Sequence, residues 1–174
     1  MRTQAPEAAT AGGASAPVSP SRLTRGAMRL WARTHAALYR RSGGRLLGVM
    51  PGPNKVRNPV VLLETVGRTS GRTRTTPLIF LRDGQNFVVV ASGRGPDGTP
   101  DWLRNLEADP LARVRLGDET ITVRAERATP DERARLWPHL VAMFARWGEM
   151  QKVSASDVPV LVLRPIAADG SAPE

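Results

Sequence analysis

An arginine-rich loop is the densest chemical signal in the sequence. It reads Gly67-Arg68-Thr69-Ser70-Gly71-Arg72-Thr73-Arg74-Thr75-Thr76-Pro77. Its two glycines permit backbone angles that let successive N–H groups converge on an anion. Its three arginines are bidentate partners for phosphate or carboxylate. Because the loop lacks the Gly-Lys-Ser/Thr ending of a nucleotide-binding phosphate loop, it predicts a different kind of anion site. An exposed hairpin loop without a ligand is the alternative.

A glycine-rich segment, Ala91-Ser92-Gly93-Arg94-Gly95, stands between a predicted strand and a predicted helix. Backbone amides and Arg94 can approach a ligand at such a helix entrance, although the composition is also that of an ordinary loop. The helix that follows carries Trp102 and Asn105 three residues apart, on one face. Trp102 could cover a flat ring while Asn105 meets its edge. A core tryptophan with a polar neighbour is the alternative.

A late helix carries an apolar stripe that continues to an aromatic end. Its members are Trp137, Leu140, Val141, Phe144 and Trp147, with Met150 just beyond. Such spacing is most often that of a core-facing helix. Aromatic residues are only 5% of the chain, however, so residues 144–150 could also form the roof of a pocket.

The composition excludes several kinds of site. The 174 residues contain no cysteine and two histidines, His35 and His139. Disulfides, thiolate catalysis and cysteine-ligated metals are therefore excluded, and we predict no metal site. Residues 1–57 hold ten basic residues and one acid, while the rest of the chain is neutral. Since the charge belongs to one end and not to the folded body, we predict no nucleic-acid partner.

Residues 22–41 predict a basic amphipathic helix that ends at Gly43-Gly44. Its apolar stripe is Leu23, Ala27, Leu30, Trp31, Thr34 and Leu38. The stripe either packs on the protein's own body or lies in an anionic membrane surface. An interaction protein driven by this basic arm is a further alternative. No stretch is apolar enough to span a membrane or to resemble a secretory signal. We therefore expect a cytoplasmic protein, with the inner face of the membrane as a peripheral location.

The segments that must position these residues read as one mainly β domain with helices. Predicted strands at residues 60–66, 76–82, 86–92, 111–116, 119–127 and 158–164 occur mostly in hairpins around Asp83-Gly84 and Gly117-Asp118. Helices are expected from Thr99-Pro100 to about Ala108 and from Thr129, which opens a capping box, to about Trp147. Six strands of this kind favour a small barrel. The organisation predicted is a disordered tail (1–21), the helix (22–44), a connector (45–58), the barrel (59–166) and a disordered tail (167–174).

The sequence resembles the deazaflavin-dependent nitroreductase family of actinobacteria, small proteins that bind coenzyme F420. The resemblance covers roughly residues 22–165 and rests on six blocks in the same order and spacing. They are Gly67-Arg68-x-Ser70-Gly71-x-x-Arg74-x-x-Pro77-Leu78, Leu81-Arg82-Asp83-Gly84, Ala91-Ser92, Trp102-x-x-Asn105-Leu106, Asp131-Glu132-Arg133-Ala134-x-x-Trp137-Pro138-x-Leu140-Val141 and Pro159-Val160.

The resemblance implies an α+β split β-barrel, similar to flavin reductases and FMN-binding proteins, with six strands, an N-terminal helix and two further helices. It implies that the arginine-rich loop holds the phosphate and acidic tail of F420, and that residues 92–95 with Trp102 and Asn105 border the deazaflavin ring. Such barrels are often dimeric, so a homodimer is also allowed. The cofactor-binding residues expected are Arg68, Thr69, Ser70, Gly71, Arg72, Arg74, Thr76, Pro77, Ala91, Ser92, Gly93, Arg94, Gly95, Trp102 and Asn105.

The sequence departs from the family where nitroimidazole-reducing members place tyrosines around the substrate. Ile79, Phe144, Trp147 and Met150 stand there, and the only tyrosine is Tyr39. The expected function is therefore hydride transfer from F420H2 to an apolar conjugated acceptor (a quinone, an enone or a nitro compound), with the cofactor supplying the chemistry. We expect nitroimidazoles to be poor substrates. The alternative is a barrel that binds F420, FMN or haem with little turnover.

Overall fold

A computed structural model describes residues 22–51, 57–92 and 99–166 of the chain. The predicted tails lie outside these residues, as does part of the predicted connector. Within them the elements are α1 (Arg22–Arg41), β1 (Val49–Pro51), β2 (Arg57–Val66), β3 (Thr73–Asp83), β4 (Asn86–Val90), α2 (Asp101–Ala108), β5 (Leu111–Leu116), β6 (Glu119–Arg127), α3 (Pro130–Met143), α4 (Arg146–Val153) and β7 (Val160–Pro165).

Six antiparallel strands close into a barrel, as predicted. The strand order is β2-β3-β4-β7-β6-β5, and a pairing of β5 with β2 completes the circle. Strand β2 is long enough to serve two partners along one edge: its start pairs with β1, and its residues 62–64 pair with β5. Its other edge pairs with β3 from Val60 to Val66. The turns carry Gly84 at φ 59° and Gly117 at φ 63°, the left-handed conformation that glycine adopts without strain.

Alternation along the strands separates an inner from an outer face. Leu78 and Phe80 of β3 face the barrel interior, where Trp102, Leu103 and Leu106 of α2 join the same cluster. Their neighbours Ile79 and Leu81 belong to a second cluster on the outer face, with side chains of α3 and α4. Helix α2 therefore closes the interior, while α3 and α4 cover the outside of the barrel.

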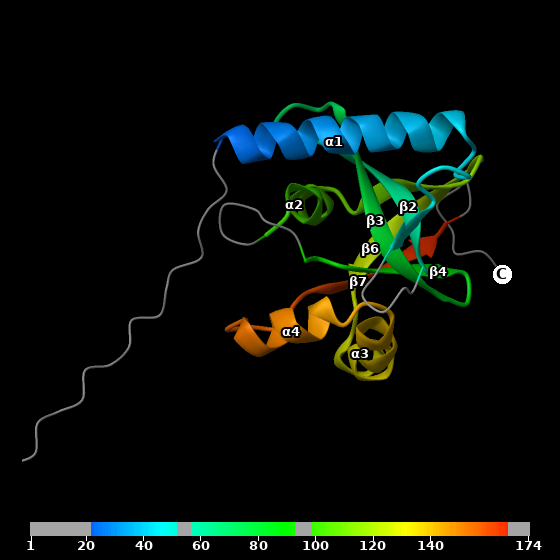
Figure 1. Cartoon of the computed structure of the whole chain (residues 1–174). Helices are drawn as coiled ribbons and strands as arrows, with labels where there is room; N and C mark the ends of the chain where they lie inside the picture. Colours follow the sequence, from blue (N-terminus) through cyan, green and yellow to red (C-terminus); the bar gives the residue numbers. More distant parts are fainter. Residues whose placement is uncertain (1–21, 52–56, 93–98, 167–174) are drawn as a thin grey trace, which may run out of the picture.

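Helix α1 lies across one side of the barrel, opposite α3 and α4 (Figure 1). Its anchor is Tyr39, 1% exposed, whose hydroxyl donates to the Val60 carbonyl (3.2 Å) and accepts from the Gly117 amide (2.9 Å). The helix ends where predicted, since Gly44 at φ 78° donates its N–H to the Tyr39 carbonyl. The one tyrosine of the chain therefore serves the packing of α1.

The apolar stripe predicted on α1 does not pack on the body, and that alternative is wrong for its described side chains. Leu30, Trp31 and Leu38 are 65%, 52% and 43% exposed. The buried face instead carries His35, Ala36 and Tyr39. The hydrophobic pattern predicted the wrong face because the contact between α1 and the barrel is made by a histidine, an alanine and a tyrosine. The face of α1 that packs is therefore not its most apolar one. Ala27 and Thr34 are exposed as well, and the side chain of Leu23 lies outside those described.

Several boundaries differ from the prediction: β2 and β3 each begin three residues earlier than predicted, and the bounds of β4 and β7 shift by one or two residues. A short strand, β1, lies in the predicted connector and pairs with the start of β2. Helix α2 has Pro100, not Thr99, at its N-cap. The late helix is two helices, so three helices follow α1 and not two. The break falls at Phe144, which leaves the helical region with φ −144° and ψ 86°. The predicted capping box is confirmed, with reciprocal bonds between Thr129 and Glu132.

Candidate functional site

The arginine-rich loop joins β2 to β3 as a tight turn. The Gly67 amide donates to the Arg72 carbonyl (2.9 Å), and the Ser70 and Gly71 amides donate to the Gly67 carbonyl (3.0 and 2.8 Å). Gly71 has a φ of 62°. A Cβ on Gly67 would lie 2.8 Å from Ser70 Oγ and 3.1 Å from the Arg72 carbonyl oxygen, so any larger residue would require the Ser70 side chain and the backbone of the turn to shift.

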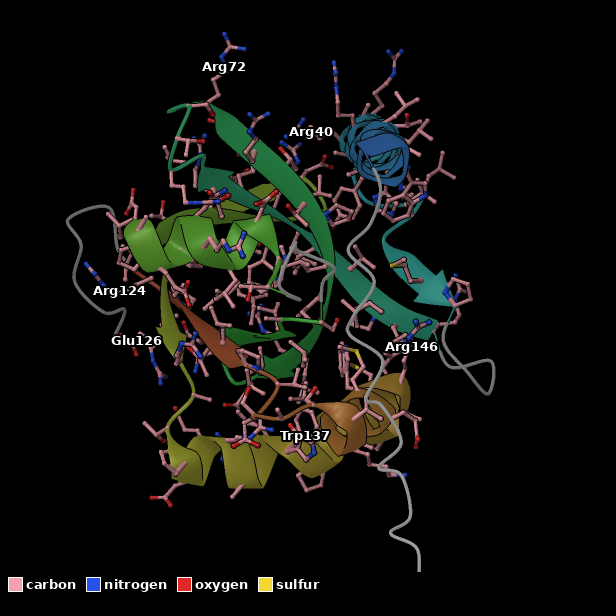
Figure 2. All side chains as sticks on the ribbon, turned by 90° about the vertical axis from the view of Figure 1, so that its left-hand side faces the viewer. Arg40, Arg72, Arg124, Glu126, Trp137 and Arg146 are labelled. Carbon is pink, nitrogen blue, oxygen red and sulfur yellow. The ribbon has the colours of Figure 1, made fainter. Side chains whose placement is uncertain are left out.

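These bonds change the expected chemistry of the loop. The amides of Gly67, Ser70 and Gly71 are used to close the turn, so they do not converge on an anion in this conformation. The arginine side chains remain as the candidate groups for binding an anion. Arg72 projects away from the barrel (Figure 2), and Arg74 donates to Ser70 Oγ at 3.3 Å. The exposed hydroxyls of Thr69 and Ser70 lie on the same loop.

Asn105 holds the start of this loop. Its Oδ1 accepts from the Arg68 backbone N–H (3.2 Å) and from Arg68 Nη1 (3.4 Å), while its Nδ2 donates to Thr65 Oγ1 (3.1 Å). Asn105 is 4% exposed and Thr65 is 2% exposed. In this arrangement Asn105 positions Arg68. Because the oxygen and the nitrogen of the Asn105 side-chain amide both have partners, these bonds do not support the expected contact with the edge of a ring.

The four residues expected to form the acceptor wall come together on the outer face of the barrel. Trp147 is buried, and Ile79, Phe144 and Met150 pack against the same cluster. Phe144 meets Trp147 edge to face, with ring centroids 5.2 Å apart. Because of the break between α3 and α4, the cluster receives Phe144 from the end of α3 and Trp147 and Met150 from α4.

Ser92 connects that wall with the glycine-rich segment. The indole Nε1 of Trp147 donates to Ser92 Oγ at 3.1 Å, across 55 residues of sequence. Ser92 directly follows Ala91 at the end of β4, and its own amide donates to the Val90 carbonyl. Gly93, Arg94 and Gly95 lie outside the described residues.

Three other expected cofactor residues, Ala91, Trp102 and Thr76, lie on the inner side of the barrel and not at this wall. Ala91 and Trp102 are 5% and 6% exposed and belong to the interior cluster. Thr76 is paired with Leu63 in the β2–β3 register, so its side chain shares the inner face of the sheet, whereas the next residue, Pro77, has the outer one. The expected cofactor and acceptor residues therefore lie in three places: the loop with exposed arginines, the barrel interior that α2 closes, and the outer wall.

Helix α3 is tied to the barrel by ion pairs. The two terminal nitrogens of Arg135, Nη1 and Nη2, donate to the Asp83 carboxylate at 2.8 and 2.9 Å. This contact lowers the pKa of Asp83. Arg164 of β7 bridges Glu126 and Glu132. The Thr129 amide and Arg164 together lower the pKa of Glu132. These contacts connect the first two turns of α3 with β3, β6 and β7 of the barrel.

Comparison with known proteins identifies the family. The family model described as F420H2-dependent quinone reductase matches residues 31–165. The chain belongs to this family. Rv1261c of Mycobacterium tuberculosis, an F420H2-dependent quinone reductase by name, is 34% identical over 134 residues, which is 75% of this chain and 87% of the relative. Rv3178 of the same organism is 40% identical over 107 residues, 62% of this chain and 90% of that protein.

A solved structure of an F420H2-dependent reductase of type FDR-A is also similar. It has a TM-score of 0.55 and 29% identity, and the match covers 60% of this chain and 93% of that one. The family resemblance drawn from the six sequence blocks is confirmed. This member of the family is an F420H2-dependent reductase, and reduced F420 is its hydride donor.

The described residues fit that cofactor at its anionic end. F420 carries a phosphodiester and glutamates, and three guanidinium groups lie close together in sequence here: those of Arg68 and Arg72 in the turn and that of Arg74 at the start of β3. The Arg68 guanidinium also lies 3.6 Å from the Asp101 carboxylate. Arginine matches such oxygens bidentately. The side chains of Arg72 and Arg74 are exposed, so they can reach a ligand without first breaking buried contacts.

Sequence reasoning missed two buried polar residues. His35 in α1 and Asn58 in β2 are 3% and 0% exposed, and neither side chain has a hydrogen-bond partner among the described residues. Burial lowers the pKa of His35. The one sequence feature that could have indicated the burial of His35 is that it is an isolated polar residue within the helical pattern. Among the described residues, no group of three or more potential metal ligands occurs, and none of the helices is both long and apolar enough to cross a membrane.

Proposed function

We propose that this chain transfers a hydride from F420H2 to an apolar conjugated acceptor, with a quinone as the first choice. The observation that carries this proposal is the cluster of Ile79, Phe144, Trp147 and Met150 beside Ser92. This wall offers contact area for a flat apolar ring. It lacks the phenol groups that a nitroimidazole-reducing pocket would present, and the phenol of Tyr39 is bonded to Val60 and Gly117 elsewhere.

Oxidation of F420H2 with a panel of acceptors tests the proposal. The panel contains a menaquinone analogue, a cyclic enone and a nitroimidazole, each at the same F420H2 concentration. We expect turnover with the quinone, slower turnover with the enone and the least with the nitroimidazole. Binding of F420 without turnover across the whole panel would favour the alternative, a carrier protein. Tighter binding of FMN or haem than of F420 would replace the chemistry.

We also propose that α1 contacts an anionic membrane surface, where lipid-soluble quinones are found. The support is the exposed stripe that contains Leu30, Trp31 and Leu38, together with exposed Arg33 and Arg41 on the same helix. An apolar stripe flanked by arginines suits the boundary between headgroups and acyl chains.

Vesicle co-sedimentation at low salt tests this contact. The variant Leu30→Ser/Trp31→Ser/Leu38→Ser should lose binding to vesicles that contain phosphatidylglycerol. Val153→Ser is the matched control, because Val153 is 86% exposed but lies on α4. If the native chain ignores the vesicles, or if the triple variant only converts a dimer to a monomer in sedimentation, the membrane contact is wrong. In the second case a second copy of the chain covers the stripe.

A further inference from the structure

The interface between α1 and the barrel buries polar atoms that are not hydrogen-bonded. His35 is 3% exposed, and neither of its ring nitrogens has a partner among the residues that the structure describes. The same is true of the side-chain amide of Asn58, which is 0% exposed. Because side chains alternate along a strand, Asn58 shares its face of β2 with Leu62, which packs against Ala36 and Tyr39 of α1. Buried polar groups without partners weaken such an interface.

The apolar part of the interface is small. Its buried cluster consists of Ala36, Tyr39 and Leu62, whereas the larger aliphatic and indole side chains described for α1 are exposed. The polar bonds that hold the helix lie at its C-terminal end, where the Tyr39 hydroxyl bonds to two backbone groups and Arg40 contacts Glu64 at 2.6 Å. Helix α1 can therefore leave the barrel at a lower free-energy cost than unfolding of the barrel core.

The turn between α1 and β1 favours such a release. At its start the Gly44 amide donates to the Tyr39 carbonyl, and at its end the Gly48 carbonyl accepts from the Val60 amide. Between these bonds Leu47 has a φ of 64°, a left-handed conformation that leucine adopts only at a cost. Because the docked helix fixes one end of the turn, release of α1 allows Leu47 to relax.

We propose that α1 is a pH-sensitive latch, which is docked on the barrel while His35 is neutral and is released when His35 binds a proton. An imidazolium ring has two N–H donors and a positive charge, and the docked position offers His35 no acceptor for either donor among the described residues. The rings stacked near it are those of Trp31 and Tyr39, with centroids 5.1 and 6.5 Å away. Burial also lowers the pKa of His35, so the docked helix favours the neutral form.

The acidic groups on the elements packed against α1 are paired with arginines. Glu64 of β2 contacts Arg40 and Arg113, at 2.6 and 3.5 Å. Asp118, in the turn between β5 and β6, contacts Arg115 at 3.7 Å. The residues of β3 that share this face opposite β2 are threonines and a proline, and β1 has no titratable side chain. The described part of the chain therefore provides no free carboxylate to compensate a charge on the buried ring.

Native-state hydrogen exchange of the full chain at pH 7.5 and 5.5, with and without low urea, tests the latch. Protection factors correct for the effect of pH on intrinsic exchange. We expect α1 amides to exchange faster than those of β4 and β7 and with little dependence on urea, because the barrel stays folded during release. The released helix has the ordinary histidine pKa of about 6.5, so docking is favoured above this pH and weakens below it. Protection of α1 should fall by up to about tenfold between the two pH values.

Replacement of the histidine separates the latch from general fraying of α1. His35→Phe should remove most of the pH dependence, and His35→Gln provides the same test if the larger ring disturbs folding. His139→Gln is the matched control, because His139 is exposed on α3 and its loss should leave the response of α1 unchanged.

Three results would overturn the latch. They are equal protection of α1 at the two pH values, exchange of α1 only together with β4 and β7, and a native pH dependence in the variants at His35. These measurements need neither cofactor nor acceptor, so their outcome is independent of the proposed reductase function.

Discussion

The Oδ1 atom of Asn105 accepts the backbone N–H of Arg68 at 3.2 Å, and this contact joins α2 to the first arginine of the arginine-rich loop. Both ends of the Asn105 amide are used, since Nδ2 donates to Thr65. A buried amide with satisfied partners at both ends holds its neighbours in one geometry. The position of Arg68 therefore depends on a residue 37 positions later in the chain.

Replacing Asn105 should affect stability and cofactor binding together. Asn105→Ala leaves the Arg68 amide and the buried Thr65 hydroxyl without this partner, so the free energy of unfolding should fall by about 1–3 kcal/mol. F420 should also bind more weakly, because Arg68 loses its anchor. Thr65→Val removes only the second contact and should leave F420 affinity nearly unchanged. Equal losses of affinity in the two variants, measured by F420 fluorescence titration, would contradict the positioning role.

The arginines of the loop should carry the affinity for the cofactor. Arg68→Ala and Arg74→Ala should each weaken F420 binding by roughly 1–3 kcal/mol, the range for a charge-assisted contact. Arg124→Ala, on the exposed face of β6, is the control for loss of one positive charge and should have little effect. Titration at two salt concentrations measures this. Unchanged dissociation constants in both loop variants would show that the anion binds elsewhere.

The close contact between α3 and α4 should tolerate no larger residue at Gly148. A Cβ there already requires Val141 to move by a few tenths of an ångström, and a branched side chain would push α4 off the barrel. Gly148→Val should lower Tm and weaken acceptor binding through the displaced Trp147, while F420 binding through the loop is retained. Calorimetry and separate KM measurements for cofactor and acceptor check this. A native Tm in the variant would mean that α4 does not seat as described.

Buried His35 should make stability fall as the pH drops below about 6.5, the ordinary pKa of histidine. Its pKa is lowered in the folded state, so the unfolded chain binds a proton more readily. Stability is therefore present above the unfolded pKa of about 6.5 and is lost as pH falls below it. Urea unfolding above and below this pH should show the loss in the native chain and a flatter profile in His35→Phe. His139→Gln, at an exposed position on α3, should keep the native slope.

Local patterns in the sequence determined the parts of the fold that neighbouring residues control. The glycines at the hairpin turns, the Thr129 capping box and the alternating strands predict their own conformations, because each depends on contacts a few residues apart. The six sequence blocks were also sufficient to identify the family and its cofactor. Local patterns did not predict the break at Phe144, because the apolar stripe continues past it to Trp147 and Met150.

Tertiary structure alone decided which face of α1 packs and which polar atoms meet. The most apolar face of α1 is exposed, and Tyr39, a residue of mixed character, makes the anchoring contacts with Val60 and Gly117. The pairs Asn105–Arg68 and Trp147–Ser92 are far apart in the sequence. Hydrogen bonds of this kind depend on distance and direction in space, and barrel closure sets both. The residue types of the candidate site could therefore be identified from the sequence. Their distribution among the arginine-rich loop, the barrel interior and the outer wall could not.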